Sequence, residues 1–133
     1  MIYLNDEVTG PWVCEKAGGL WVPRKSRTIG WLENGELVAG VVYEDWTGTN
    51  FNCHIRGSKV RKHSEFVKTI FDYPFNQLKA KRITASIGSN NIAAINLVTR
   101  LGFILECVLE QAIPDGDIHI YRMFRDECRY LRG

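Results

Sequence analysis

The sequence predicts an α+β fold in which a mixed, mainly antiparallel sheet is flanked by helices. Asn34-Gly35, the strongest short hairpin signal, separates two β-rich runs. Several further short runs alternate apolar and polar residues, whereas two longer segments carry apolar residues at helical spacing. The expected element order is β-β-β-α-β-α-β-β, a layered α+β arrangement.

The first three predicted strands cover residues 28–33, 37–44 and 51–56. Both faces of the second strand are largely apolar, which predicts a central position in the sheet. The third strand has an apolar face and a polar face, formed by Phe51, Cys53 and Ile55 and by Asn52, His54 and Arg56 respectively. Upstream, Thr9 and Pro11 suggest the start of a short helix through residues 12–16.

A helix is expected from about residue 63 to residue 78. Its predicted buried stripe consists of Phe66 or Val67, Ile70, Phe71, Phe75 and Leu78. Pro74 lacks an N–H group and crowds the carbonyl of Ile70, which predicts a kink in this helix. A buried strand is expected next, over residues 83–87.

The second predicted helix covers residues 91–101, with an apolar face formed by Ile92, Ile95, Val98 and Leu101. Ser89 and Asn90 are expected to accept hydrogen bonds at its start, and Gly102 to supply a left-handed stop. The last strands are predicted at 103–110 and 118–124. In the first of these, alternation places Phe103, Leu105, Cys107 and Leu109 on one face.

Length and composition predict one globular domain, residues 1–133. The 45% hydrophobic and 24% charged content disfavours disorder, and no apolar run approaches a membrane span. The formal charge of +2 is too small to indicate a nucleic-acid binder by itself. Four scattered cysteines favour reduced thiols over disulfides or a metal site, and no signal-type segment opens the chain. We therefore expect a cytoplasmic protein without a metal.

Residues 91–103 read N-x-x-A-I-x-L-x-x-x-L-G-F. This pattern resembles the helix-strand segment of the Gcn5-related N-acetyltransferase (GNAT) family. The resemblance implies the fold of that family for residues from about 28 to 124. It also implies transfer of an acetyl group from acetyl-CoA to a primary amine, by direct attack and without a covalent enzyme intermediate. The amine is expected on a small molecule or on a protein.

The resemblance implies a coenzyme A pyrophosphate site in the loop after strand 51–56. Lys59 and Ser64 match the basic and small positions of the family loop, whereas Lys62 replaces a glycine. Cations from Lys59, Arg61 and Lys62 could compensate for reduced backbone contact. The other residues implied for coenzyme A are Ile55, His63 and Asn91. From the residues alone, the same turn is also consistent with a solvated basic loop and, less favoured, with a nucleic-acid contact, and Asn91 is consistent with a helix cap.

Catalytic roles are less defined. Val98 occupies the position where many family members have a tyrosine that protonates the leaving thiolate. Tyr121 and Tyr43 are the candidate substitutes. A general base must accept a proton near neutral pH, which suits His54, with Glu44 and Asp45 as acidic alternatives. His119 is expected to be structural.

The alternative hypothesis is a protein with this fold but little turnover. Such a protein would contact a macromolecule, either protein or nucleic acid, through the basic turn 56–62 and the tail 125–133. The changes at Lys62 and Val98 support this alternative. Exposed strand edges would permit either a monomer or a homodimer.

Overall fold

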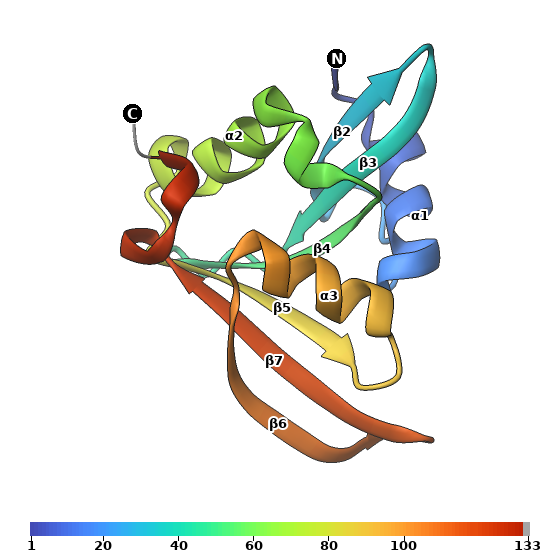
Figure 1. Cartoon of the computed structure of the whole chain (residues 1–133), viewed down its shortest axis with the longest axis vertical. Helices are drawn as coiled ribbons and strands as arrows, with labels where there is room; N and C mark the ends of the chain where they lie inside the picture. Colours follow the sequence, from blue (N-terminus) through green and yellow to red (C-terminus); the bar gives the residue numbers. More distant parts are fainter. Residues whose placement is uncertain (132–133) are drawn as a thin grey trace.

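Seven strands form one sheet in the computed structural model, which describes residues 1–131 (Figure 1). Their order is β1-β2-β3-β4-β5-β7-β6, and every neighbouring pair is antiparallel except β4 and β5. The strands are β1 (Ile2–Tyr3), β2 (Arg27–Glu33), β3 (Glu36–Glu44), β4 (Asn50–Gly57), β5 (Arg82–Gly88), β6 (Ile104–Ile113) and β7 (Gly116–Phe124). The predicted fold class is confirmed.

Two elements precede the predicted order, namely β1 and helix α1 (Asp6–Ala17). The expectation that Thr9 caps this helix was wrong. The cap is Asn5, whose side-chain oxygen accepts a hydrogen bond from the Val8 amide at 3.3 Å. Thr9 is fully buried within the helix, where it faces the sheet.

Helix α1 lies directly on β2 and β3 because two strand residues lack side chains there. A Cβ atom at Gly40 would lie 2.9 Å from methyl carbons of both Thr9 and Val13. A Cβ atom at Gly30 would lie 2.9 Å from the Thr9 hydroxyl oxygen. These two glycines therefore permit the close contact between α1 and one face of the sheet.

Helices α2 (Ser64–Asp72) and α3 (Ile92–Leu101) cover the opposite face, and α3 lies in front of β4 and β5 in Figure 1. The main hydrophobic core lies between these helices and the alternate side chains of the central strands. Its largest fully buried members include Tyr43, Phe66, Ile70, Phe71, Phe75, Ile83, Leu101 and Met123. The apolar face predicted for β4, with Phe51, Cys53 and Ile55, is buried in this core.

The helix irregularity expected at Pro74 takes the form of a π-helical turn, Tyr73–Gln77, that continues α2. Pro74 has no N–H group to donate to the carbonyl of Ile70, and the buried hydroxyl of Tyr43 donates to that carbonyl instead, at 2.5 Å. The wider turn shifts the helix face. Leu78, expected in the buried stripe, is consequently 37% exposed.

Helix α3 is capped by Asn91 rather than by Ser89 or Asn90, because the Asn91 side-chain oxygen accepts from the Ala94 amide at 3.3 Å. Gly102 ends the helix with φ = 107°, as predicted. The predicted apolar face is partly wrong. Ile92 is 59% exposed, and Ala94 is buried with Val98 and Leu101 instead.

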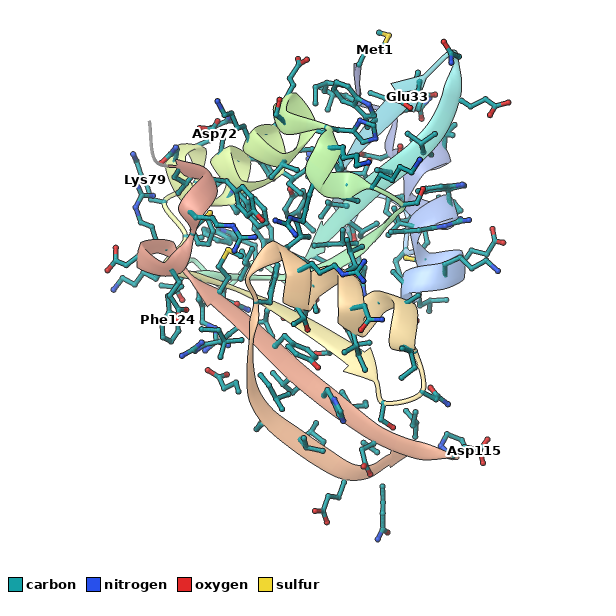
Figure 2. All side chains as sticks on the ribbon, viewed as in Figure 1. Met1, Glu33, Asp72, Lys79, Asp115 and Phe124 are labelled. Carbon is teal, nitrogen blue, oxygen red and sulfur yellow. The ribbon has the colours of Figure 1, made fainter. Side chains whose placement is uncertain are left out.

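Strands β6 and β7 form a long hairpin at the outer edge of the sheet, away from α1 and α2 (Figure 1). Asp115 lies in the turn that joins them (Figure 2). Leu105 pairs with Tyr121, and Cys107 pairs with the next β7 residue, Ile120. A bulge at Glu106 therefore places Leu105 and Cys107 on opposite faces, so the predicted alternation along 103–110 was wrong.

Candidate active site

Strands β4 and β5 part from each other near the middle of the sheet. Their parallel pairing joins Asn50–Asn52 to Arg82–Thr84, although the strands continue to Gly57 and Gly88. Beyond Asn52, β4 pairs only with β3. An unpaired strand edge presents backbone N–H and C=O groups that can bind an extended ligand.

A cleft of about 450 Å³ lies against the separated half of β4. Its volume lies within the usual range for small-molecule sites. It is lined by three elements and one β3 side chain: Trp12, Lys16 and Ala17 of α1; Ile55, Arg56, Gly57 and Ser58 at the end of β4; Asn91, Ala93, Ala94 and Leu97 of α3; and Val38. The sheet is thus open between α1 on one face and α3 on the other.

Polar contacts hold the two sides of this cleft in place. The side-chain amide nitrogen of Asn91 donates to the backbone carbonyl of Lys16 at 3.0 Å, which joins α3 to α1. The Arg56 guanidinium donates to the Trp12 carbonyl at 2.7 Å and lies 3.9 Å from the centre of the Trp12 ring. Asn91 is therefore both a helix cap and part of the cleft wall.

A second, much smaller cavity of about 10 Å³ lies deeper, between the separated strands. It is lined by Cys53, His54 and Ile55 of β4, Ala85, Ser86 and Ile87 of β5, Ala17 of α1, and Ala94 and Val98 of α3. Ala17, Ile55 and Ala94 line both cavities, so the small cavity is the inner end of the cleft. Val98 therefore lies at this inner end, although its side chain carries no proton donor.

His54 lines the inner end of the cleft and forms a hydrogen-bonded pair with Glu44. The distance from His54 Nε2 to Glu44 Oε1 is 2.6 Å, and the two side chains are 11% and 22% exposed. A carboxylate can only accept, so the Nε2 atom carries the proton and the Nδ1 atom is the remaining basic nitrogen. The sequence offered these residues as alternatives for one role, whereas the structure joins them in one unit.

Two thiols near Glu44 are held in the neutral form. Burial raises the pKa of the Cys53 thiol, and the Glu44 carboxylate raises it further. The same two causes, in the same order, raise the pKa of Cys14 on α1. A neutral thiol is a poor nucleophile.

The other catalytic candidates lie elsewhere. Tyr43 is buried in the core and donates to Ile70, and burial raises its pKa well above the ordinary tyrosine value. Tyr121 is buried on β7 opposite Ala85 and lines neither cavity. Asp45 is exposed, and its carboxylate accepts from the Asn52 amide at 3.0 Å.

The basic loop lies between the cleft and α2. Gly57 and Ser58 line the cleft, whereas Lys59, Arg61 and Lys62 are exposed beside it. His63 has a different role from the one expected. Its ring stacks on Trp31 with centroids 5.6 Å apart, and its Nδ1 atom lies 3.3 Å from a carboxylate oxygen of Glu33. The exposed residue Ser64 begins α2.

Sequence reasoning missed the contribution of α1, namely Trp12, Lys16 and Ala17. No local signal marks these residues, since they reach the cleft only because α1 packs across β3 and β4. The tail also differs from the expectation of a free basic segment. The Tyr130 ring stacks on Phe71, and its hydroxyl donates to the Leu101 carbonyl at 2.9 Å. Residues 132–133 lie outside the described part of the chain.

No protein-family model matches the sequence, and no curated protein is significantly similar to it. Solved structures are similar. Spermidine/spermine N-acetyltransferase SpeG from Vibrio cholerae has a TM-score of 0.67 at 14% identity, covering 98% of this chain and 94% of that chain. A GNAT-family acetyltransferase from Bacillus anthracis has a TM-score of 0.62 at 18% identity, covering 77% of this chain and 68% of that chain.

The chain has the GNAT fold. A further structure, a SpeG chimera from Vibrio cholerae and hSSAT, has a TM-score of 0.62 at 16% identity over 83% of this chain and 73% of that chain. The fold implied by the sequence resemblance is therefore confirmed. No group of three or more His, Cys, Asp and Glu residues that could hold a metal ion occurs within residues 1–131. None of the helices in this part of the chain combines the length and apolar character needed to span a membrane.

Proposed function

We propose that this protein is an N-acetyltransferase that moves an acetyl group from acetyl-CoA to a primary amine. The observation that carries the proposal is the parting of β4 from β5 over a cleft that ends at the His54–Glu44 pair. The similarity to structures named as N-acetyltransferases supports the same reaction class. We further propose a cytoplasmic location, because four free cysteines suit a reducing compartment.

The residues of the cleft suit the parts of coenzyme A. The separated edge of β4 could bond the amide groups of the pantetheine arm, while Ile55, Ala94 and Leu97 supply apolar contacts. At the start of α2, the first amide to bond within the helix is that of Val67, which donates to the His63 carbonyl at 3.0 Å. The amides of Ser64, Glu65 and Phe66 precede it, and such groups suit a pyrophosphate. Lys59, Arg61 and Lys62 add positive charge beside this helix end.

His54 and Glu44 would handle the proton of the acceptor amine. Acetyl-CoA supplies the acetyl group as a thioester. In the proposal, His54 Nδ1 accepts a proton from the amine, and Glu44 orients the ring and stabilises its charged form. Val98 cannot protonate the leaving sulfur, so the thiolate leaves without a donor at that position. The neutral Cys53 thiol supports direct transfer to the amine.

Calorimetry and thermal-shift measurements with acetyl-CoA test the binding step. We expect saturable binding, and we expect Lys59→Ala, Arg61→Ala and Lys62→Ala each to weaken it by about 1 kcal/mol, since exposed cations interact weakly with phosphate. Lys68→Ala, which removes an exposed cation on the outer side of α2, is the matched control. Absence of binding at millimolar acetyl-CoA would refute the proposed function.

Steady-state kinetics with an amine acceptor test the catalytic pair. His54→Gln should lower turnover by about 10²–10⁴-fold, the usual contribution of a general base, while acetyl-CoA affinity stays unchanged. Glu44→Gln should reduce turnover less, because the imidazole that accepts the proton remains and only its partner is changed. Glu110→Gln, at an exposed position on β6, is the control. Full turnover by the His54 variant would exclude this residue from the mechanism.

A further inference from the structure

A groove of about 310 Å³ lies at the other end of β4 and shares no lining residue with the acetyl-CoA cleft. Its walls come from the loop before β2, the end of β3, the start of β4 and the turn after α2. They consist of Arg24, Lys25, Ser26, Arg27, Tyr43, Glu44, Asp45, Trp46, Phe51, Tyr73 and Leu78. Glu44 lines this groove and also contacts His54, so it connects the groove to the proposed catalytic base.

One part of the groove is aromatic and open to solvent. The Trp46 and Phe51 rings have centroids 4.7 Å apart, and the Phe51 ring stacks on Tyr73 at 6.0 Å. Trp46 is 41% exposed although it packs against this aromatic cluster. Aromatic surface that remains accessible beside a polar wall is suited to the apolar segment of a small ligand.

The charged residues of the groove have both signs. Glu44 and Asp45 supply two carboxylates at the end of β3, and Arg24, Lys25 and Arg27 supply three cations from the loop. Arg27 lies 3.7 Å from Asp6, whereas Arg24 and Lys25 have no ion pair within residues 1–131. A ligand with only positive charges would gain from the carboxylates but would be repelled by the loop.

We propose that this groove binds the acetyl acceptor, and that the acceptor is an amino carboxylate with an apolar segment. The ammonium group is bound at the Glu44–His54 pair, the apolar segment lies on the exposed Trp46 ring, and the carboxylate pairs with Arg24 and Lys25. This inference rests on the proposed acetyltransferase function. It differs from the polyamine acceptor in the names of the similar structures.

The reaction balances without a further reactant. The ammonium loses one proton to His54, and the free amine nitrogen bonds to the acetyl carbon. The bond from that carbon to sulfur then breaks, and the nitrogen releases its second proton as the amide forms. The thiolate takes up a proton from solvent or from His54. The products are an N-acetyl amino carboxylate and coenzyme A.

Matched pairs of acceptors, differing only in the carboxylate, test the inference. One pair is phenylalanine and 2-phenylethylamine, and the other is 6-aminohexanoate and pentylamine. Spermidine is the reference polyamine. The assay follows coenzyme A release at a fixed concentration of acetyl-CoA. We expect at least one amino carboxylate to exceed its partner amine in kcat/KM by about tenfold, as for one charge-assisted contact. The double variant Arg24→Gln/Lys25→Gln should remove this preference. Lys68→Gln/Lys81→Gln, which removes the same charge outside the groove, should retain it.

A binding measurement makes the test independent of turnover. The indole N–H signal of Trp46, assigned with Trp46→Phe, should shift in NMR spectra on addition of the preferred amino carboxylate and not in the Arg24/Lys25 double variant. Equal or better use of the simple amines or of spermidine would overturn the acceptor class while leaving acetyl transfer intact. Absence of acetyl-CoA binding would instead overturn the proposed function, and the acceptor inference with it.

Discussion

The substitution Tyr43→Phe tests how the core compensates for the proline in the helix after β4. Pro74 cannot donate to the carbonyl of Ile70, and the Tyr43 hydroxyl donates to it at 2.5 Å within a fully buried environment. Removing the hydroxyl leaves this carbonyl without that donor. The loss of such a bond costs about 1–3 kcal/mol, and we take about 2 kcal/mol for this site.

The expected change in melting temperature follows from the size of the chain. Unfolding entropy near 60 °C is about 2.1 cal/mol/K per residue, which for 133 residues makes 1 kcal/mol equivalent to about 4 °C. Tyr43→Phe should therefore lower the melting temperature by about 7 °C in a calorimetric or circular-dichroism scan. Tyr73→Phe is the matched control, because Tyr73 belongs to the same aromatic cluster but its hydroxyl forms no hydrogen bond within residues 1–131.

The pH dependence provides a second check on the same bond. Burial raises the pKa of Tyr43 well above its ordinary value, so this tyrosine binds its proton more tightly in the folded state than in the unfolded state. Its contribution to stability is therefore complete below the unfolded pKa of about 10 and declines as pH rises further. The difference in melting temperature between the wild type and Tyr43→Phe should be constant from about pH 6 to pH 9. A decrease in melting temperature no larger than that of Tyr73→Phe would refute the argument.

Three further predictions concern other parts of the molecule. Gly102→Val should destabilise the fold by about 2 kcal/mol or more in urea denaturation, because φ is 107° at the end of α3 and a β-branched residue is strained there. An unchanged denaturation midpoint would mean that this strain is absent. When the native protein is treated with a maleimide, mass spectrometry should find Cys107 modified first and Cys53 last. Cys107 is exposed, whereas Cys53 is buried and its thiol pKa is raised. Early labelling of Cys53 would contradict the described packing. Hydrogen bonding by the Arg82 side chain lowers the pKa of the Glu106 carboxyl below 4.5, so the stability from this contact is present above the unfolded pKa and is lost as pH falls through the folded pKa. Carbon NMR titration should show the Glu106 pKa rising in Arg82→Gln, and no rise would mean that this contact does not cause the shift.

Local sequence signals determined much of the fold. The β2–β3 hairpin follows from Asn34-Gly35, since both residues adopt the positive φ values, 53° and 79°, that a tight hairpin turn requires. The end of α3 at Gly102 follows from the same conformational preference. The burial of alternate β4 residues follows from the two-residue period of a strand. Each of these features depends on a few adjacent residues, so a short segment is sufficient to predict it.

The site depended on contacts that no short segment contains. Asn91 reaches the Lys16 carbonyl across 75 residues of sequence, and Glu44 reaches His54 only because β3 and β4 pair in one register. The sequence identified His54, Glu44 and Asn91 as candidate site residues from their residue types and positions. Their combination into one cleft was decided by the tertiary structure, because packing between distant segments sets which side chains meet.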